Sequence, residues 1–222
     1  MTLQELINAV MLKATGKPTI LASSNTKWEK IRGIANYYQH AWANEPGQHW
    51  GSLYDMMEVG TVTNSSMYEL PDTMAELSTA KGDKVVIVGL DGTRGEFELV
   101  SHDDLLSHPV GNYCAKIQNS LVFNTGFAED DPLYGGTIWA PGYYAVNDLV
   151  EATDKVVVDS PEWLVTMCAA EYIRNDIVKQ NQYGNLVAEA NNLMTAMIKN
   201  NRGAQVRHIR GGFRNGGGLS YD

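Results

Sequence analysis

Residues 84–100 read KVVIVGLDGTRGEFELV and carry the clearest β signal in the chain. Residues 84–90 are rich in Val and Ile, and residues 94–100 alternate apolar with charged side chains. Asp91-Gly92 between them is a strong tight-turn signal, because both residue types tolerate the positive φ angles of hairpin turns. The pattern predicts an antiparallel hairpin.

Weaker strand signals surround this hairpin. Residues 59–70 hold β-branched side chains on both sides of an Asn-Ser-Ser turn, and further short apolar runs are 121–123, 136–139 and 143–146. Their regular spacing is typical of a small antiparallel sheet or sandwich. Residues 102–106 could form a short helix.

Helical patterns precede the β-rich segment. Thr2 and Glu5 form a possible capping box, and apolar residues at three- and four-residue spacing follow until Gly16. A second helix starts near Ser23 or Ser24. The face with which this helix would pack consists of residues separated by alternating steps of three and four, namely Trp28, Ile31, Ala35, Tyr38 and Trp42.

A second helical region follows the β-rich segment. Ser160 can cap a helix whose first position is Pro161, and Glu162 lies near the positive end of its dipole. We expect a break near residues 182–184 and a fourth helix over about 186–198. After Asn201 the sequence is rich in glycine and offers little to pack.

Together these patterns predict an α+β fold. Its core would be an antiparallel helical bundle, formed by the N- and C-terminal helices, with a β-rich insertion and a flexible C-terminal tail. The expected domains are a helical body of residues 1–54 and 159–201, an insertion of residues 55–158 and an extended tail of residues 202–222.

The net charge of −9 over 222 residues is unevenly placed. Residues 202–222 contain four arginines and one aspartate, or +3, so the remainder carries −12. Such an acidic body argues against a DNA-binding surface, which needs clustered Lys and Arg. We expect no membrane segment or signal peptide, and we expect Cys114 and Cys168 to be buried thiols in a protein made in a reducing cytoplasm.

No common catalytic or phosphate-binding motif occurs in the sequence. His102, Asp103, Asp104 and His108 form the nearest approach to a metal cluster, but neighbouring residues point apart and a metal needs converging ligands. The acidic run of residues 128–131 lacks the spaced ligands of a calcium loop. We therefore expect no enzyme activity, no cofactor and no metal.

Aromatic residues offer a different kind of site. Trp139, Tyr143 and Tyr144 lie beside Gly-Gly and Pro-Gly pairs within the insertion. Exposed aromatic side chains are enriched in interfaces, so these three are candidate interface residues.

The order and spacing of several short motifs resemble the head–tail adaptor, or head completion, family of tailed bacteriophages. The likeness covers residues 1–200 and rests on Trp42-x-x-x-Pro46-x-x-x-Trp50, Thr61-Val62-Thr63 with Tyr68-Glu69-Leu70-Pro71, Tyr144-x-x-x-x-Asp148-Leu149 and Pro161-Glu162-Trp163-Leu164. The segment between Val100 and Leu121 is longer than the family pattern suggests.

The resemblance implies a structural virion protein of the neck. Such subunits form a ring, usually of twelve copies, that binds the portal protein, extends the DNA channel and docks a tail or nozzle protein. DNA would pass through the lumen without sequence-specific binding. No cofactor or active site is implied.

The basic tail is the candidate portal contact. Its apolar anchors would be Ile209, Phe213 and Tyr221, and its arginines would pair with acidic groups: Arg202, Arg207, Arg210 and Arg214. The alternative function is another tail or baseplate component with a receptor or glycan contact at Trp139, Tyr143 and Tyr144. A small carboxylate-dependent hydrolase is the third hypothesis, although no site signature supports it.

Overall fold

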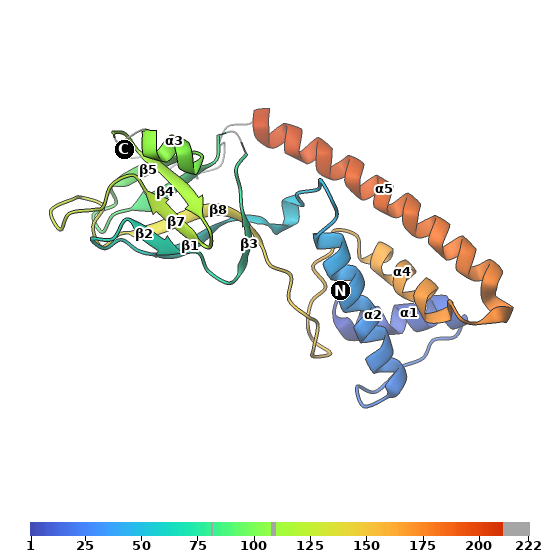
Figure 1. The fold of residues 1–222 in the computed structure, drawn as a ribbon. Helices are drawn as coiled ribbons and strands as arrows, with labels where there is room; N and C mark the ends of the chain where they lie inside the picture. Colours follow the sequence, from blue (N-terminus) through green and yellow to red (C-terminus); the bar gives the residue numbers. More distant parts are fainter. Residues whose placement is uncertain (81, 108–109, 211–222) are drawn as a thin grey trace, which may run out of the picture. The chain divides into compact units, whose positions relative to one another are not determined.

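A computed structural model describes residues 1–80, 82–107 and 110–210, with residues 202–210 described by their backbone alone. The chain divides into two compact units, which we call the helical unit and the β unit. The helical unit comprises Met1–Ser52 and Val146–Val206, and among the described residues the β unit comprises Leu53–Ala145 and residues 207–210 at the end of α5. Figure 1 shows the elements of each unit.

The expected fold class is wrong. The β unit contains a curled, mixed sheet of eight strands rather than a small insertion on a helical bundle, and the described part of the chain has five α-helices. The strands are β1 (Tyr54–Thr61), β2 (Met67–Glu69), β3 (Met74–Leu77), β4 (Lys84–Val88), β5 (Arg94–Leu99), β6 (Tyr113–Ile117), β7 (Ser120–Phe123) and β8 (Thr137–Tyr144).

The strands follow the order β1-β8-β4-β5-β6-β7-β2, and β3 also pairs with β8. The predicted β4–β5 hairpin is confirmed, with Val85 opposite Phe97. The parallel pair β5–β6 was not expected, since the sequence suggested only antiparallel neighbours. Parallel strands need a crossover connection, and here the segment between them contains α3 (His102–Ser107).

The two short strands expected over residues 136–139 and 143–146 are a single strand, β8. Pro141-Gly142 lies between the two expected strands, but β4 pairs with β8 up to Trp139 and β3 pairs with it from Gly142 onward. A side chain at position 142 would come within 2.8 Å of the Glu76 carbonyl oxygen and 3.0 Å of the Met74 side chain. The glycine therefore allows β3 to approach rather than ending the strand.

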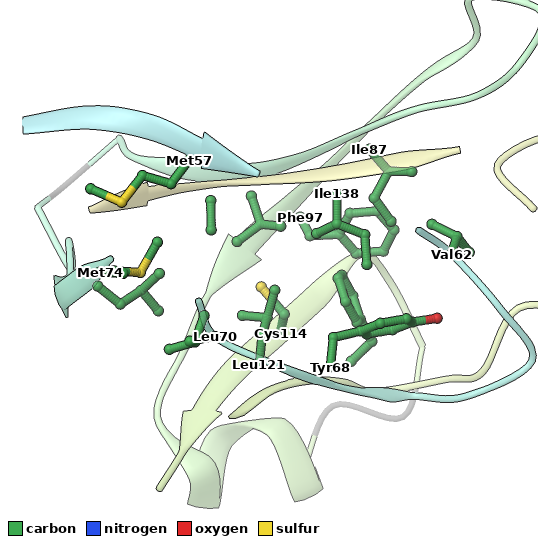
Figure 2. Close-up of a cluster of buried hydrophobic side chains, with 14 of the residues drawn as sticks. Met57, Val62, Tyr68, Leu70, Met74, Ile87, Phe97, Cys114, Leu121 and Ile138 are labelled. Atoms are coloured by element: carbon green, nitrogen blue, oxygen red, sulfur yellow. The ribbon is translucent and has the colours of Figure 1, made fainter. Parts of the chain in front are cut away.

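The inner face of the sheet encloses a single apolar core. Figure 2 shows side chains from several strands meeting there, among them Met57, Ile87, Phe97, Leu121 and Ile138. Phe123 makes edge-to-face contacts with Phe97, Phe127 and Tyr68 at centroid distances of 4.9, 5.3 and 5.7 Å. Because the sheet is curled, its inner face surrounds these side chains and buries them.

The helical unit is formed by α1 (Leu3–Thr15), α2 (Thr26–Ala43), α4 (Pro161–Ile173) and most of α5 (Gln180–Arg210). The predicted caps of α1 and α4 are confirmed: Thr2 and Glu5 form a capping box, and the Ser160 hydroxyl accepts a hydrogen bond from the Trp163 amide. The α2 helix begins later than expected, because Asn25 rather than Ser23 or Ser24 is its cap.

The expected break at residues 182–184 and the end of helical structure near Asn201 are both wrong. A short 3-10 turn, Ile177–Lys179, separates α4 from α5, and α5 then continues through Gly184 to Arg210. Burial of Leu186, Ala190 and Met197 on the helical unit outweighs the glycine, whose cost inside a helix is about 1 kcal/mol.

The start of α5 is fixed to the end of α1. The Lys13 ammonium lies 2.6 Å from the Glu189 carboxylate and donates a hydrogen bond to the Thr166 hydroxyl. The Gln182 amide and the Lys179 ammonium donate to the last carbonyls of α1. None of the helices in the described ranges is long and apolar enough to cross a membrane.

Candidate interaction surface

The outer face of the sheet carries an aromatic centre flanked by carboxylates. Strand register places Glu58, Trp139, Val86 and Glu96 in one row across β1, β8, β4 and β5. A second row joins Tyr54, Tyr143 and Glu76 across β1, β8 and β3. Directly opposite residues share one face of a sheet. We call the set Tyr54, Glu58, Glu76, Glu96, Trp139 and Tyr143 the acidic aromatic face.

Trp139 lies at the centre of this face and is partly exposed. Its cross-strand neighbour Val86 is only 7% exposed although it does not face the inner core. Val86 is therefore covered from the outside by surrounding side chains. Glu96 is paired with two cations, Lys84 at 2.8 Å and Arg94 at 3.7 Å, whereas Glu58 lies exposed opposite Trp139.

Two tyrosines at one end of the face are joined to the β3–β4 connection. The Tyr54 and Tyr143 rings meet edge to face at 5.5 Å, and the Tyr54 hydroxyl donates a hydrogen bond of 3.0 Å to Asp83. The Ser78 hydroxyl donates to the other Asp83 oxygen at 2.5 Å. The bond to Asp83 fixes the Tyr54 ring, and the edge-to-face contact places the Tyr143 ring against it, as a preformed interface requires.

Burial raises the pKa of both tyrosines. For Tyr54 the adjacent Asp83 carboxylate adds to the effect, and for Tyr143 a hydrogen bond with Ser78 opposes it. In the helical unit, burial and then Glu171 raise the pKa of Tyr38 to about 12. The phenols therefore remain protonated donors at neutral pH.

An alkaline titration tests these assignments. The folded-state pKa values lie above the unfolded value of about 10, so the tyrosines contribute their full stability below pH ~10 and lose it as the pH rises through the folded-state values. We expect late-titrating phenols in the near-ultraviolet absorbance of the folded protein and one fewer of them in Tyr54→Phe. Titration of every tyrosine at the ordinary pH would refute the geometry.

The three aromatic residues singled out in the sequence do not share one surface. Trp139 and Tyr143 lie on the acidic aromatic face, but Tyr144 has the opposite parity along β8 and is opposite the buried Met74. Tyr144 is 39% exposed at the strand end. Tyr54, Glu58 and Glu76 were missed, because only strand register brings them beside Trp139 and Tyr143.

The C-terminal candidates fall at the limit of the described chain. Arg202, Arg207, Ile209 and Arg210 belong to the backbone of α5. Phe213, Arg214 and Tyr221 lie outside the described residues. Just before them, the Asn201 amide donates to the His49 carbonyl at 2.9 Å and accepts from the Gly51 amide at 3.1 Å, which fixes this point of α5 on the helical unit.

Charge is divided sharply between the two units. Residues 53–145 of the β unit hold 14 acidic and four basic residues, a net charge of −10. The helical unit holds 11 acidic and ten basic residues, a net charge of −1. The acidic body expected from the sequence is thus essentially the β unit.

The remaining candidates for chemistry are separate from this face. Burial raises the pKa of the Cys114 thiol to about 12 and raises that of Cys168 further, so neither is a ready nucleophile. Over residues 1–80, 82–107 and 110–210, no three His, Cys, Asp or Glu side chains are grouped to hold a metal ion. His108 lies outside the described residues.

Comparison with known proteins gives no family assignment: no protein-family model matches the chain, and no curated protein matches it.

Proposed function

We propose that this chain is a structural virion subunit, a head–tail adaptor that assembles into a ring below the portal of a tailed bacteriophage. The motif order described above supports this proposal, and so does the division of charge. In the proposal the ring extends the DNA channel and docks the tail, and the subunit carries out no reaction.

The observation that carries the proposal is the net charge of −10 on residues 53–145, which include every strand of the β unit, whereas the helical unit is nearly neutral. A ring of such units would surround its lumen with a negative potential. Phosphates would be repelled from the wall, so exiting DNA would slide rather than bind. The helical units, at −1, could pack against one another without strong repulsion.

Electron microscopy of a mixture with the portal protein tests this function. We expect negatively stained portal rings to gain a second, coaxial ring when the chain is added at low micromolar concentration. Bovine serum albumin, another acidic protein, serves as the control. Portal rings that look the same with and without the chain would contradict the proposal.

The second candidate is a tail or baseplate component that binds a receptor glycan. Trp139 and Tyr143 favour it, because aromatic faces beside hydroxyl and carboxylate groups suit sugar rings. Binding to a glycan array that disappears in Trp139→Ala and persists in Tyr144→Ala would favour this function over the adaptor.

A further inference from the structure

We propose that the acidic aromatic face of one copy binds the arginine-bearing C-terminal segment, residues 202–222, of a second copy. The inference deepens the proposed function by naming a partner for this segment other than the portal. The contact between copies does not depend on the adaptor function. Only the conclusion that this contact helps to build a ring rests on that function.

Charge makes the chain complementary to itself. Residues 202–222 carry +3, counting Arg202 at the end of the helical unit, whereas residues 53–145 carry −10. Opposite potentials accelerate encounter and set orientation, and they act between copies of one chain as between different proteins. The segment is the one strongly basic stretch of an otherwise acidic sequence.

The acidic aromatic face has the chemistry that recognises a guanidinium group. Trp139 is partly exposed, and cross-strand neighbours such as Glu58 lie about 5 Å from it at Cβ. An arginine stacked on an indole gains a cation–π contact, and adjacent carboxylates accept its N–H donors. Glu76, in the second row beside Tyr143, extends the acidic rim.

The segment and the face are separate stretches of the chain, because the face is formed by strands within residues 53–145 and the segment follows Asn201. The segment starts after Asn201, which is 6% exposed and bonded to the His49–Gly51 backbone of the helical unit. The face lies on the β unit. A contact between copies therefore joins two unlike surfaces, and repeated contacts of that kind close into rings or continue as filaments.

A charge swap in the full-length protein tests this contact. One variant reverses the segment (Arg207→Glu with Arg210→Glu), and the other reverses the face (Glu58→Lys with Glu76→Lys). We expect the wild type to self-associate with rising concentration in sedimentation velocity at about 0.01 M salt, where charges interact over about 30 Å. At about 1 M salt, where that range is about 3 Å, it should stay monomeric.

Each variant alone should remain monomeric at low salt, and an equimolar mixture should associate again. Mixing restores both contacts, because the reversed segment meets the reversed face and the two natural partners still meet each other. Glu129→Lys with Asp130→Lys is the matched control: it makes the same charge change on an exposed loop of the same unit and should associate like the wild type.

Three results would overturn the inference: a wild type that is monomeric at every concentration, a face variant that associates normally, or a mixture that stays monomeric. Far-ultraviolet circular dichroism of each variant separates loss of the contact from loss of the fold. If a monomeric wild type still forms rings on the portal, the inference fails and the adaptor function stands. If charge-swap rescue occurs and no portal ring forms, the contact stands and the adaptor function fails.

Discussion

Replacing Trp50 by alanine is expected to lower the free energy of unfolding of the helical unit by about 3–5 kcal/mol, the usual cost of removing a large core side chain. Trp50 is 1% exposed and stacks on Trp42 with ring centroids 4.8 Å apart. Its indole N–H donates a 2.6 Å hydrogen bond to the Trp42 carbonyl at the end of α2. Urea denaturation followed by tryptophan fluorescence measures the effect.

Trp50→Phe is the matched control for this prediction. It keeps an aromatic ring in the stack and removes the indole donor, so it should cost substantially less than the alanine variant. A loss below about 1 kcal/mol in Trp50→Ala would mean that this ring is not a core residue.

Phe123→Ala is expected to destabilise the β unit by a similar amount, about 3–5 kcal/mol. Phe123 is 2% exposed and meets three other aromatic rings in the core. Its removal would leave a cavity that several strands cannot close together. Hydrogen exchange read by mass spectrometry should therefore quicken in peptides from β4, β5 and β7.

The adjacent residue supplies the control for the core of the β unit. Val122 is on the same strand but on its other face and is only partly buried. Val122→Ala should change exchange in the same peptides far less than Phe123→Ala. Equal effects of the two substitutions would contradict the inward position of Phe123.

Local signals in the sequence were enough for some elements. Asp91-Gly92 and its flanking Val and Ile residues predicted the β4–β5 hairpin, because a tight turn fixes both pairing and register. The caps of α1 and α4 were predicted for the same reason, since a cap is made by residues three positions apart.

Elements that depend on distant contacts were not predicted. Pro141-Gly142 has the composition of a turn, and only the close approach of β3 explains why β8 continues through it. Likewise, Gly184 looked like a helix break, but the buried side chains further along α5 hold the helix together. The parallel pairing of β5 with β6 requires a crossover that short-range patterns do not reveal.

The candidate surface was likewise predicted only in part, because some of its residues come from other strands. The sequence analysis predicted Trp139 and Tyr143 as interface residues because several aromatic residues lie close together there, and the structure places both on one face. The carboxylates beside them come from other strands: Glu58 lies about 80 residues from Trp139 in sequence, yet directly opposite it in the sheet. Cross-strand register is a property of the whole sheet, so this acidic surround could not be inferred from the sequence.

Localisation in the intact virus particle tests the adaptor function most directly. Cryo-electron microscopy of particles that contain the chain should resolve a ring of copies at the neck, between the portal and the tail, with one helical unit and one β unit in each subunit. Density for this chain at the tail tip or baseplate, or its absence from the particle, would contradict the adaptor function.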